Sequence, residues 1–337
     1  MADYSNELFD LYFASDFNFK DYLSGLKIAL DAVQKIIPTR NKRIAVQASV
    51  KQNSASTLGG TAPGAQYTIQ YNSANINIPS ALYIKDYAIM DIISVFYHQN
   101  NRWTFNGGNY DFVAIAVHEI FHGLGFYSNI EPFFQYFGLY TTFLPQQDIQ
   151  PVFLPPTIFD YHISCNNVKL LELLEDYTTI CVSKDFLSNS SQLAIKVAAY
   201  ELVPESTRDK MNQYMSTPNS CTFESNLINF ELFSGTDLKP AVMSHSSYTE
   251  KGILMHAKYK DGVTYDGVEY YGSVLNVLGY DQNVTFEVAM INNCKKMISD
   301  INIQQAQSRI DAGEFRSSIA CPQTWSLFLL FWLLLIQ

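Results

Sequence analysis

The feature that most constrains this chain is a His-Glu-x-x-His motif formed by His118, Glu119 and His122. It lies in an apolar stretch, DFVAIAVHEIFHGLGFYS, that runs from 111 to 128 and predicts a buried helix. Residues four apart on a helix share one face, so the two histidines can bind one metal ion, with Glu119 in reach of a water on that ion. The alternative is that two core histidines have this spacing by chance. This interpretation is less favoured, because burying two histidines with a glutamate is costly unless they are paired or metal-bound. The motif therefore predicts a zinc site.

The two ends of this helix also carry signals. Asp111 is a suitable N-cap, and Gly125 is expected just beyond the C-terminal end in the left-handed conformation. Apolar periodicity and turn residues predict the other elements of the chain. The predicted helices span 16–37, 81–97, 168–177, 192–202 and 271–278. A strand is predicted at 43–50 and one or two strands at 66–78, with a loop at 101–109 and a turn-rich stretch at 262–267.

A catalytic zinc site needs a third protein ligand and keeps its fourth position for water. In the compact pattern HExxHxxGxxH the third histidine would stand at 128, where this chain has Ser128. A thermolysin-like site would use a glutamate on a later helix, and Glu172 or Glu175 could serve. His245 and His256 are the other candidates.

Around His245 the chain resembles the leishmanolysin-type metzincins, a family of zinc metalloproteases. In that family HExxHxLGF is followed by a long insertion, a third histidine and, about ten residues later, a Leu-Met pair that forms the Met-turn beneath the metal; His245 and Leu254-Met255 match this order. The chain is also similar to a looser group of secreted microbial proteins with HEIxHGLGF, a Pro-x-x-Phe-Asp stretch (156–160 here) and Ser-His before Leu-Met. His256 departs from the family, which usually has a small residue or Pro after the methionine.

The resemblance implies an α+β fold, namely a zincin/metzincin-like catalytic domain with a twisted mixed sheet, an active-site helix and a long cysteine-bearing insertion before the third ligand. It implies Zn²⁺ bound by His118, His122 and His245, with Glu119 as general base and Met255 in the Met-turn. It also implies a strand along the upper rim of the cleft that pairs with extended substrate, for which 66–78 is the candidate. The expected divisions are an N-terminal catalytic subdomain (1–127), an inserted region (128–233), a C-terminal subdomain (234–300) and a tail (301–337).

Composition narrows the function classes. The 337 residues are 47% hydrophobic and 16% charged, which excludes a disordered chain. The formal net charge is −10 and the sequence contains no basic block. Nucleic-acid binding is therefore not expected, because phosphate contacts need clustered Lys and Arg.

The first residues of the sequence show no targeting signal, whereas the last residues resemble a membrane-anchor signal. The first 20 residues are acidic and show no secretory signal, so we expect a signal peptide, and an inhibitory pro-segment, to be missing from the recorded start. At the other end, the small residues 311–313 are followed by a polar spacer (314–324) and a terminal apolar run (325–336). This order is typical of a GPI-anchor signal, in which the lipid would be attached at 311–313 or, alternatively, at 317–318. A tail anchor or a buried terminal helix is the alternative. These features predict an extracellular protein held at the cell surface by a lipid anchor.

Cysteine usage fits an oxidising compartment. Cys321 falls in the segment that anchoring would remove, and the other cysteines form an even set compatible with two disulfides in any of three connectivities: Cys165, Cys181, Cys221 and Cys294. Two glycosylation sequons begin at Asn189 and Asn283.

Taken together, the sequence predicts a zinc-dependent endopeptidase that acts on extracellular proteins or peptides. Glu119 would activate the attacking water and return its proton to the leaving amine. One alternative is a cell-surface binding or adhesion protein on a degenerate protease scaffold, in which Ser128 marks a lost ligand. Another is a structural zinc domain, which a fourth ligand such as His256 would favour.

Overall fold

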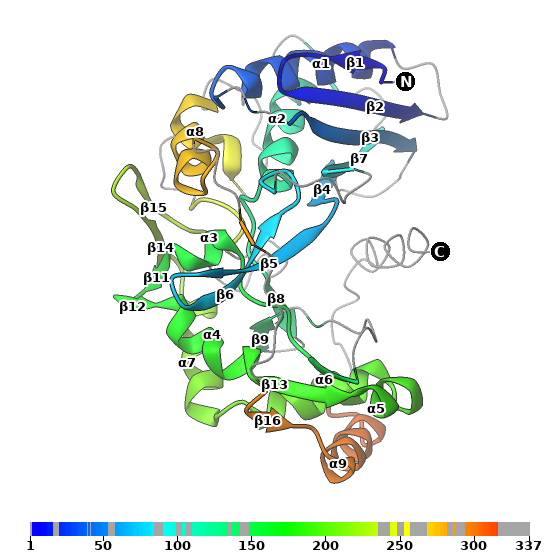
Figure 1. The fold of residues 1–337 in the computed structure, drawn as a ribbon, viewed down its shortest axis with the longest axis vertical. Coiled ribbons are helices and arrows are strands. Elements are labelled where there is room, and N and C mark those ends of the chain that lie inside the picture. Colours follow the sequence, from blue (N-terminus) through cyan, green and yellow to red (C-terminus); the bar gives the residue numbers. More distant parts are fainter. Residues whose placement is uncertain are drawn as a thin grey trace.

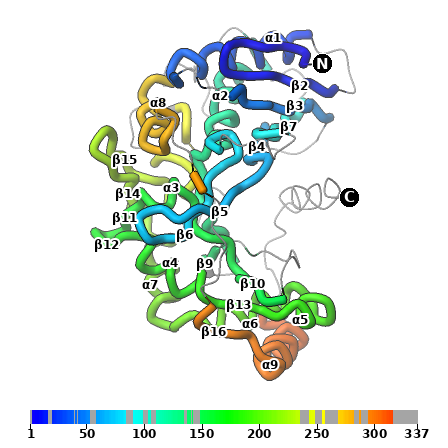
Figure 2. Tube along the Cα trace, viewed as in Figure 1, coloured from blue at the N-terminus to red at the C-terminus, as the bar shows by residue number. Residues whose placement is uncertain are grey.

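The computed structural model describes residues 2–15, 20–38, 40, 42–52, 58–83, 90–98, 103–105, 110–133, 136–139, 141, 148–234, 243–247, 253–256, 268–281, 286–287 and 294–315. These residues form an α+β fold with several sheets and two disulfides. The N-terminal part, coloured blue to cyan, occupies one end of the molecule, and the green region 128–233 occupies the other (Figures 1 and 2).

The N-terminal part is built on a mixed five-stranded sheet whose strand order is β1-β2-β3-β7-β4. The central strands β2, β3 and β7 are parallel, and the edge strands β1 and β4 are each antiparallel to their neighbour. The strands span Tyr4–Ser5 (β1), Phe9–Ser15 (β2), Ile44–Gln52 (β3), Ile92–His98 (β7) and Gly59–Pro63 (β4).

Helices α1 (Lys20–Gln34) and α2 (Phe112–Gly123) pack against each other, and α2 also contacts β4 and β7. At the crossing, a Cβ atom on Gly25 would lie 2.6 Å from Cδ1 of Phe112, so only a glycine allows this close approach. The predicted helix at 16–37, strand at 43–50 and buried helix after 111 are confirmed in kind.

The predicted helix at 81–97 is wrong, because residues 92–98 form strand β7. The burial of this stretch alternates along the strand, and its sequence, IISVFYH, is rich in β-branched and aromatic residues. Pairing with β3 on one side and β4 on the other fixes it as a strand. The apolar spacing of this stretch is compatible with a helix or a strand, and its pairing with neighbouring strands determines that it forms a strand.

The expectation of one or two strands at 66–78 is confirmed in kind. These residues form a separate two-stranded hairpin, β5 (Gln66–Tyr71) with β6 (Ala74–Pro79), whose turn residues Asn72 and Ser73 have positive φ. The edge strand that lies along α2 is β4, because it joins the five-stranded sheet beside β7 and contacts α2 directly. The sequence alone does not indicate this strand, because four of its five residues, GGTAP, are Gly, Ala or Pro, which are depleted in strands.

Most of the region after α2 builds the other half of the molecule (Figure 1). It contains the hairpin β8–β9, a four-stranded sheet in the order β12-β11-β14-β15 and a three-stranded sheet in the order β10-β13-β16. The strands span Ile130–Phe133 (β8), Tyr136–Leu139 (β9), Ile149–Pro151 (β10), Ile163–Cys165 (β11), Val168–Lys169 (β12), Ile180–Ser183 (β13), Cys221–Glu224 (β14), Asn229–Glu231 (β15) and Lys296–Met297 (β16). The helices span Ile158–Tyr161 (α3), Leu170–Thr178 (α4), Lys184–Asn189 (α5), Gln192–Leu202 (α6), Glu205–Ser216 (α7), Val268–Val277 (α8) and Asp300–Asp311 (α9), with a short 3-10 turn at Ile253–Met255 (η2).

Disulfides join Cys165 to Cys221 and Cys181 to Cys294, which selects one of the three possible connectivities. The second bridge ties the segment 294–315 to the region 128–233, where β16 pairs with β13 and α9 packs on α6. Helix α8 instead returns to the N-terminal part and contacts α1 (Figure 1).

Several predictions concern residues outside the described ranges. They are the turn at 262–267, the sequon at Asn283 and the terminal segment 316–337, with Cys321 and its predicted anchor signal. Asn189 is described and lies exposed at the end of α5. Within the described ranges, none of the helices combines the length and apolarity that crossing a bilayer requires.

Candidate metal centre

Helix α2 begins and ends as its local chemistry predicts. The side chain of Asp111 accepts a hydrogen bond from the backbone N–H of Val113 at 2.8 Å, which makes it the N-cap. At the other end Gly125 has φ +110°, and the N–H groups of Gly125 and Phe126 bond to the carbonyls of His122 and Phe121, both at 3.0 Å. This is a Schellman motif, so both predicted helix ends are confirmed.

The two motif histidines have fixed ring orientations. Nδ1 of His122 donates to the backbone carbonyl of Phe126 at 2.7 Å, and Nδ1 of His118 donates to that of Leu254 at 2.5 Å. A carbonyl oxygen can only accept, so each Nδ1 carries the ring proton. In the neutral rings Nε2 is then left with a bare lone pair.

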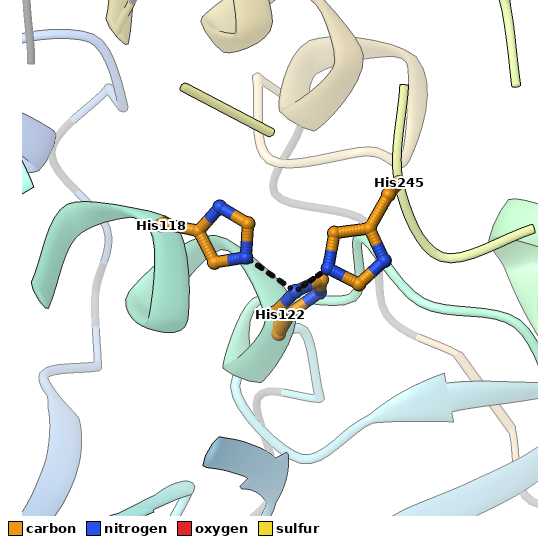
Figure 3. Close-up of side chains that lie close together, drawn as sticks. All are labelled: His118, His122 and His245. Atoms are coloured by element: carbon orange, nitrogen blue, oxygen red, sulfur yellow. Dashed lines mark hydrogen bonds between the residues drawn. The ribbon is translucent and has the colours of Figure 1, made fainter. Parts of the chain in front are cut away.

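Those nitrogens converge with that of His245. Nε2 of His122 lies 3.0 Å from Nε2 of His118 and 3.2 Å from Nε2 of His245 (Figure 3). The nitrogens that the three rings offer all lie within 4.8 Å of one another. Figure 3 shows the rings turned toward a common point, two from α2 and one from the segment 243–247.

Burial favours the neutral form of the two motif rings, those of His118 and His122. It lowers the pKa of His118 to about 4, with the nearby His256 adding to the effect and the bond to Leu254 opposing it. Burial lowers the pKa of His122 well below its usual value, and His118 and His245 lower it further. Neutral rings with inward lone pairs repel one another at such distances unless a cation lies among them.

The donor set fits a metal ion such as zinc. Two ligands at about 2.05 Å from a tetrahedral zinc are about 3.3 Å apart, close to the spacing of the histidine nitrogens. Backbone carbonyls that bind the second ring nitrogen are the usual outer partners of metal-binding histidines. The site is thus a group of three histidines that could hold a metal ion.

His245 reaches the centre because its short segment is bonded on both sides. Its carbonyl accepts from the N–H of Phe233 at 2.8 Å, and the N–H of Ser246 donates to the carbonyl of Met255 at 2.9 Å. The buried hydroxyl of Ser246 also lies 2.7 Å from that of Tyr271 on α8. His245 therefore lies between the end of β15 and the 3-10 turn η2.

Met255 ends the η2 turn and is fully buried. The residue before it, Leu254, supplies the carbonyl that holds His118, and η2 contacts α2. The segment that the sequence assigns to a Met-turn is therefore bonded directly to one of the candidate ligands.

The other candidate ligands lie elsewhere. Glu172 and Glu175 are exposed on α4, and Glu175 pairs with Lys295 at 2.7 Å. His256 is 4% exposed and its backbone bridges Ser246, but it does not belong to the group of three. Among the described residues, no fourth His, Cys, Asp or Glu joins that group.

Glu119 lies on α2 between the two motif histidines and is 7% exposed. Burial raises the pKa of its carboxyl to about 7, and a hydrogen bond with the Thr61 side chain opposes the rise. A carboxyl that titrates near neutral pH is suited to accept and return a proton.

Several residues of the site escaped sequence reasoning. The N–H of Ser128 donates to Oγ of Ser244 at 3.0 Å, which links the end of the helix segment to the residue before His245. Asp160 is fully buried and accepts from the N–H groups of Asn129 and Thr157 at 3.1 and 2.8 Å. The Thr-x-x-Asp spacing of 157–160 is a capping-box signal, and the structure contains that box, so the pattern could have placed Asp160 on a helix start.

Comparison with models of protein families, with curated proteins and with solved structures finds no match to this chain.

Proposed function

We propose that the chain is a zinc-dependent endopeptidase with a metzincin-like catalytic domain, similar to the leishmanolysin type. The observation that carries this proposal is the convergence of three histidines, two of them with tautomers set by backbone carbonyls. Ring nitrogens that converge this closely at a half-buried site are costly for a fold unless a cation lies among them. The absence of a fourth such ligand among the described residues favours a catalytic over a structural site, because catalysis needs an open position.

His118, His122 and His245 would hold Zn²⁺, which lowers the pKa of bound water to about 7 and polarises a carbonyl. Glu119 would accept the proton of the attacking water and deliver it to the leaving amine. Met255 would contribute an apolar wall next to the ligands, since it is fully buried and its sulfur is not needed for binding.

The proposed setting is extracellular. Two disulfides support an oxidising compartment, and both lie in the described part of the chain. Attachment to the cell surface by a lipid anchor after 311–313 remains part of the proposal, as does glycosylation at the exposed Asn189.

The test is zinc content and casein cleavage of the purified full chain and its variants. We expect one zinc per chain and cleavage that a chelator abolishes and added zinc restores. Glu119→Ala should keep the zinc and lose at least about 10²-fold in rate, the usual scale for a general base. His245→Ala should lose both properties, whereas His98→Ala, at a histidine that bonds Tyr22 on α1 and is outside the group of three, is the matched control.

Each alternative has its own result. Zinc and activity that survive His245→Ala but not His256→Ala would move the third ligand to His256. A folded wild type without zinc would refute the proposal and favour a surface binding protein on a degenerate scaffold. Stoichiometric zinc without any turnover would favour a structural zinc domain.

A further inference from the structure

The feature that carries a further inference is Tyr271, a fully buried tyrosine on α8. Its ring makes T-shaped contacts with three phenylalanine rings, at centroid distances of 6.4 Å to Phe121, 5.7 Å to Phe126 and 6.0 Å to Phe230. Phe121 belongs to α2, Phe126 lies in the turn that ends α2, and Phe230 belongs to β15. Tyr271 therefore packs between the helix of the two motif histidines and the strand β15.

Helix α8 fixes this ring relative to α2. It contacts α1, and α1 packs against α2. A Cβ atom on Gly272 would lie 3.1 Å from Cδ1 and 3.2 Å from Cβ of Ile36, just after the end of α1, so α8 approaches this part of the chain closely. The ring of Tyr271 is thus anchored to the N-terminal part, which also carries His118 and His122.

The hydroxyl of Tyr271 reaches the residue that follows His245. Its oxygen lies 2.7 Å from Oγ of Ser246, and both residues are 0% exposed. Each hydroxyl has one proton and two lone pairs, so either of them can donate. Because both groups are shielded from solvent, bulk water does not compete for this hydrogen bond.

Ser246 is in turn fixed through its backbone. Its N–H donates to the carbonyl of Met255 at 2.9 Å, and it forms an antiparallel bridge with Leu232. The side-chain bond to Tyr271 adds a further restraint on the same residue. Since His245 is the next residue along the chain, restraining Ser246 limits where the His245 ring can point.

Tyr271 also supports a second candidate ligand. The carbonyl of Phe126 accepts the hydrogen bond from Nδ1 of His122 at 2.7 Å, and the Phe126 ring is one of those that Tyr271 contacts. One buried side chain therefore lies behind two histidines that come from segments 123 residues apart in the sequence.

We propose that Tyr271 is a positioning residue of the metal centre, which aligns His245 through the hydroxyl bond to Ser246. This inference rests on the proposed function, because it assigns Tyr271 a role in that same zinc site. Partners that orient metal ligands typically change metal affinity by about 10–100-fold when they are removed. Tyr271 has this role at a distance of one residue from the ligand.

The first experiment measures the zinc affinity of the full chain by competition with a chromophoric chelator. Tyr271→Phe keeps the ring and removes the hydroxyl, so zinc affinity should fall about tenfold. Ser246→Ala should cause a loss of similar size. Tyr177→Phe is the matched control, because Tyr177 is equally buried and its hydroxyl donates to the carbonyl of Phe137 in the region 128–233. The zinc affinity of this control should stay at the wild-type value.

The double variant tests whether the two hydroxyls act through one bond. Ser246→Ala and Tyr271→Phe together should lower zinc affinity about tenfold rather than about hundredfold, because each change removes the same interaction. A second measurement uses Co²⁺ as the probe, since its visible absorption depends on ligand geometry. The absorption of the Co²⁺ protein should change in Tyr271→Phe and should match the wild type in Tyr177→Phe.

Unchanged zinc affinity in Tyr271→Phe, an equal loss in Tyr177→Phe, a loss of about hundredfold in the double variant, or an unchanged cobalt spectrum would each overturn the positioning role. Those results leave the proposed function standing, because they require a wild type that binds zinc. A wild type that binds neither zinc nor cobalt would instead refute the proposed function, and the role of Tyr271 with it.

Discussion

Replacing Asp160 with alanine should destabilise the protein by about 3 kcal/mol. Its carboxylate is fully buried and accepts two backbone N–H groups, from Thr157 at 2.8 Å and Asn129 at 3.1 Å. A buried N–H left without an acceptor costs about 1–3 kcal/mol, so two such groups cost about 2–6 kcal/mol. Burial raises the pKa of this carboxyl, which means that the fold disfavours its charge, and removing the charge offsets part of the loss.

The assay is urea unfolding of the full chain at neutral pH, with zinc and with a chelator. Asp160→Asn keeps an oxygen for the two N–H groups and should lose only about 1 kcal/mol. Asp209→Ala, on the exposed face of α7, is the control and should stay within about 0.5 kcal/mol of wild type. Equal unfolding midpoints for Asp160→Ala and Asp209→Ala would refute the reasoning, because they would mean that the two N–H groups do not depend on the carboxylate.

Three further predictions concern Ser244, Gly125 and His162. Ser244→Ala removes the acceptor for the Ser128 N–H, so zinc affinity measured by competition with a chromophoric chelator should fall about tenfold, while unchanged affinity would exclude a role for this bond. Gly125→Ala places a side chain at φ +110° and 3.1 Å from Pro79, so the free energy of unfolding should fall by about 1–2 kcal/mol in urea, whereas Gly138→Ala, without positive φ, should lose less. Burial, with help from Lys169, lowers the pKa of His162 to about 4, below its value near 6.5 in the unfolded chain. The contribution of His162 to the free energy of unfolding is therefore fully present above pH 6.5 and is lost as the pH falls toward 4. His162→Phe keeps contact with the Phe223 ring and should remove this part of the pH dependence of unfolding between pH 4 and 6.5.

The parts that sequence predicted well are governed by local chemistry. Both ends of α2 follow from an N-cap aspartate and a glycine with positive φ, each within a few residues of the turn it makes. Helix α6 matches its predicted range, 192–202, because apolar spacing and the preceding Ser191 define it locally. The same reasoning placed His118 and His122 on one face of a helix.

The parts that sequence missed depend on pairing between distant segments. Strand β7 is a strand because β3 and β4 flank it, which no window around 81–97 reveals. Gly59 meets Glu119 only through the register that sets Gly59 opposite Phe96. The disulfide connectivity likewise follows from the pairing of β11 with β14, which brings Cys165 opposite Cys221. Sequence left four candidates for the third ligand, and only the fold brings His245 to the other two histidines.

The distance of the candidate third ligand, His245, along the chain is compatible with a stable metal centre. Closing a flexible loop of the 123 residues between His122 and His245 costs about 3 kcal/mol more than closing a loop of six, the separation in the compact motif. The Cys165–Cys221 bridge, at a separation of 56, shortens that loop too little to change this by more than about 0.5 kcal/mol. Zinc binding coupled to folding reaches about 10–16 kcal/mol in zinc-finger peptides, so the entropy of the long loop is small beside the binding free energy that zinc can supply. What the long insertion requires instead is a means of aligning His245, and the bond from Ser128 to Ser244 meets that need at the position where the compact motif has its histidine.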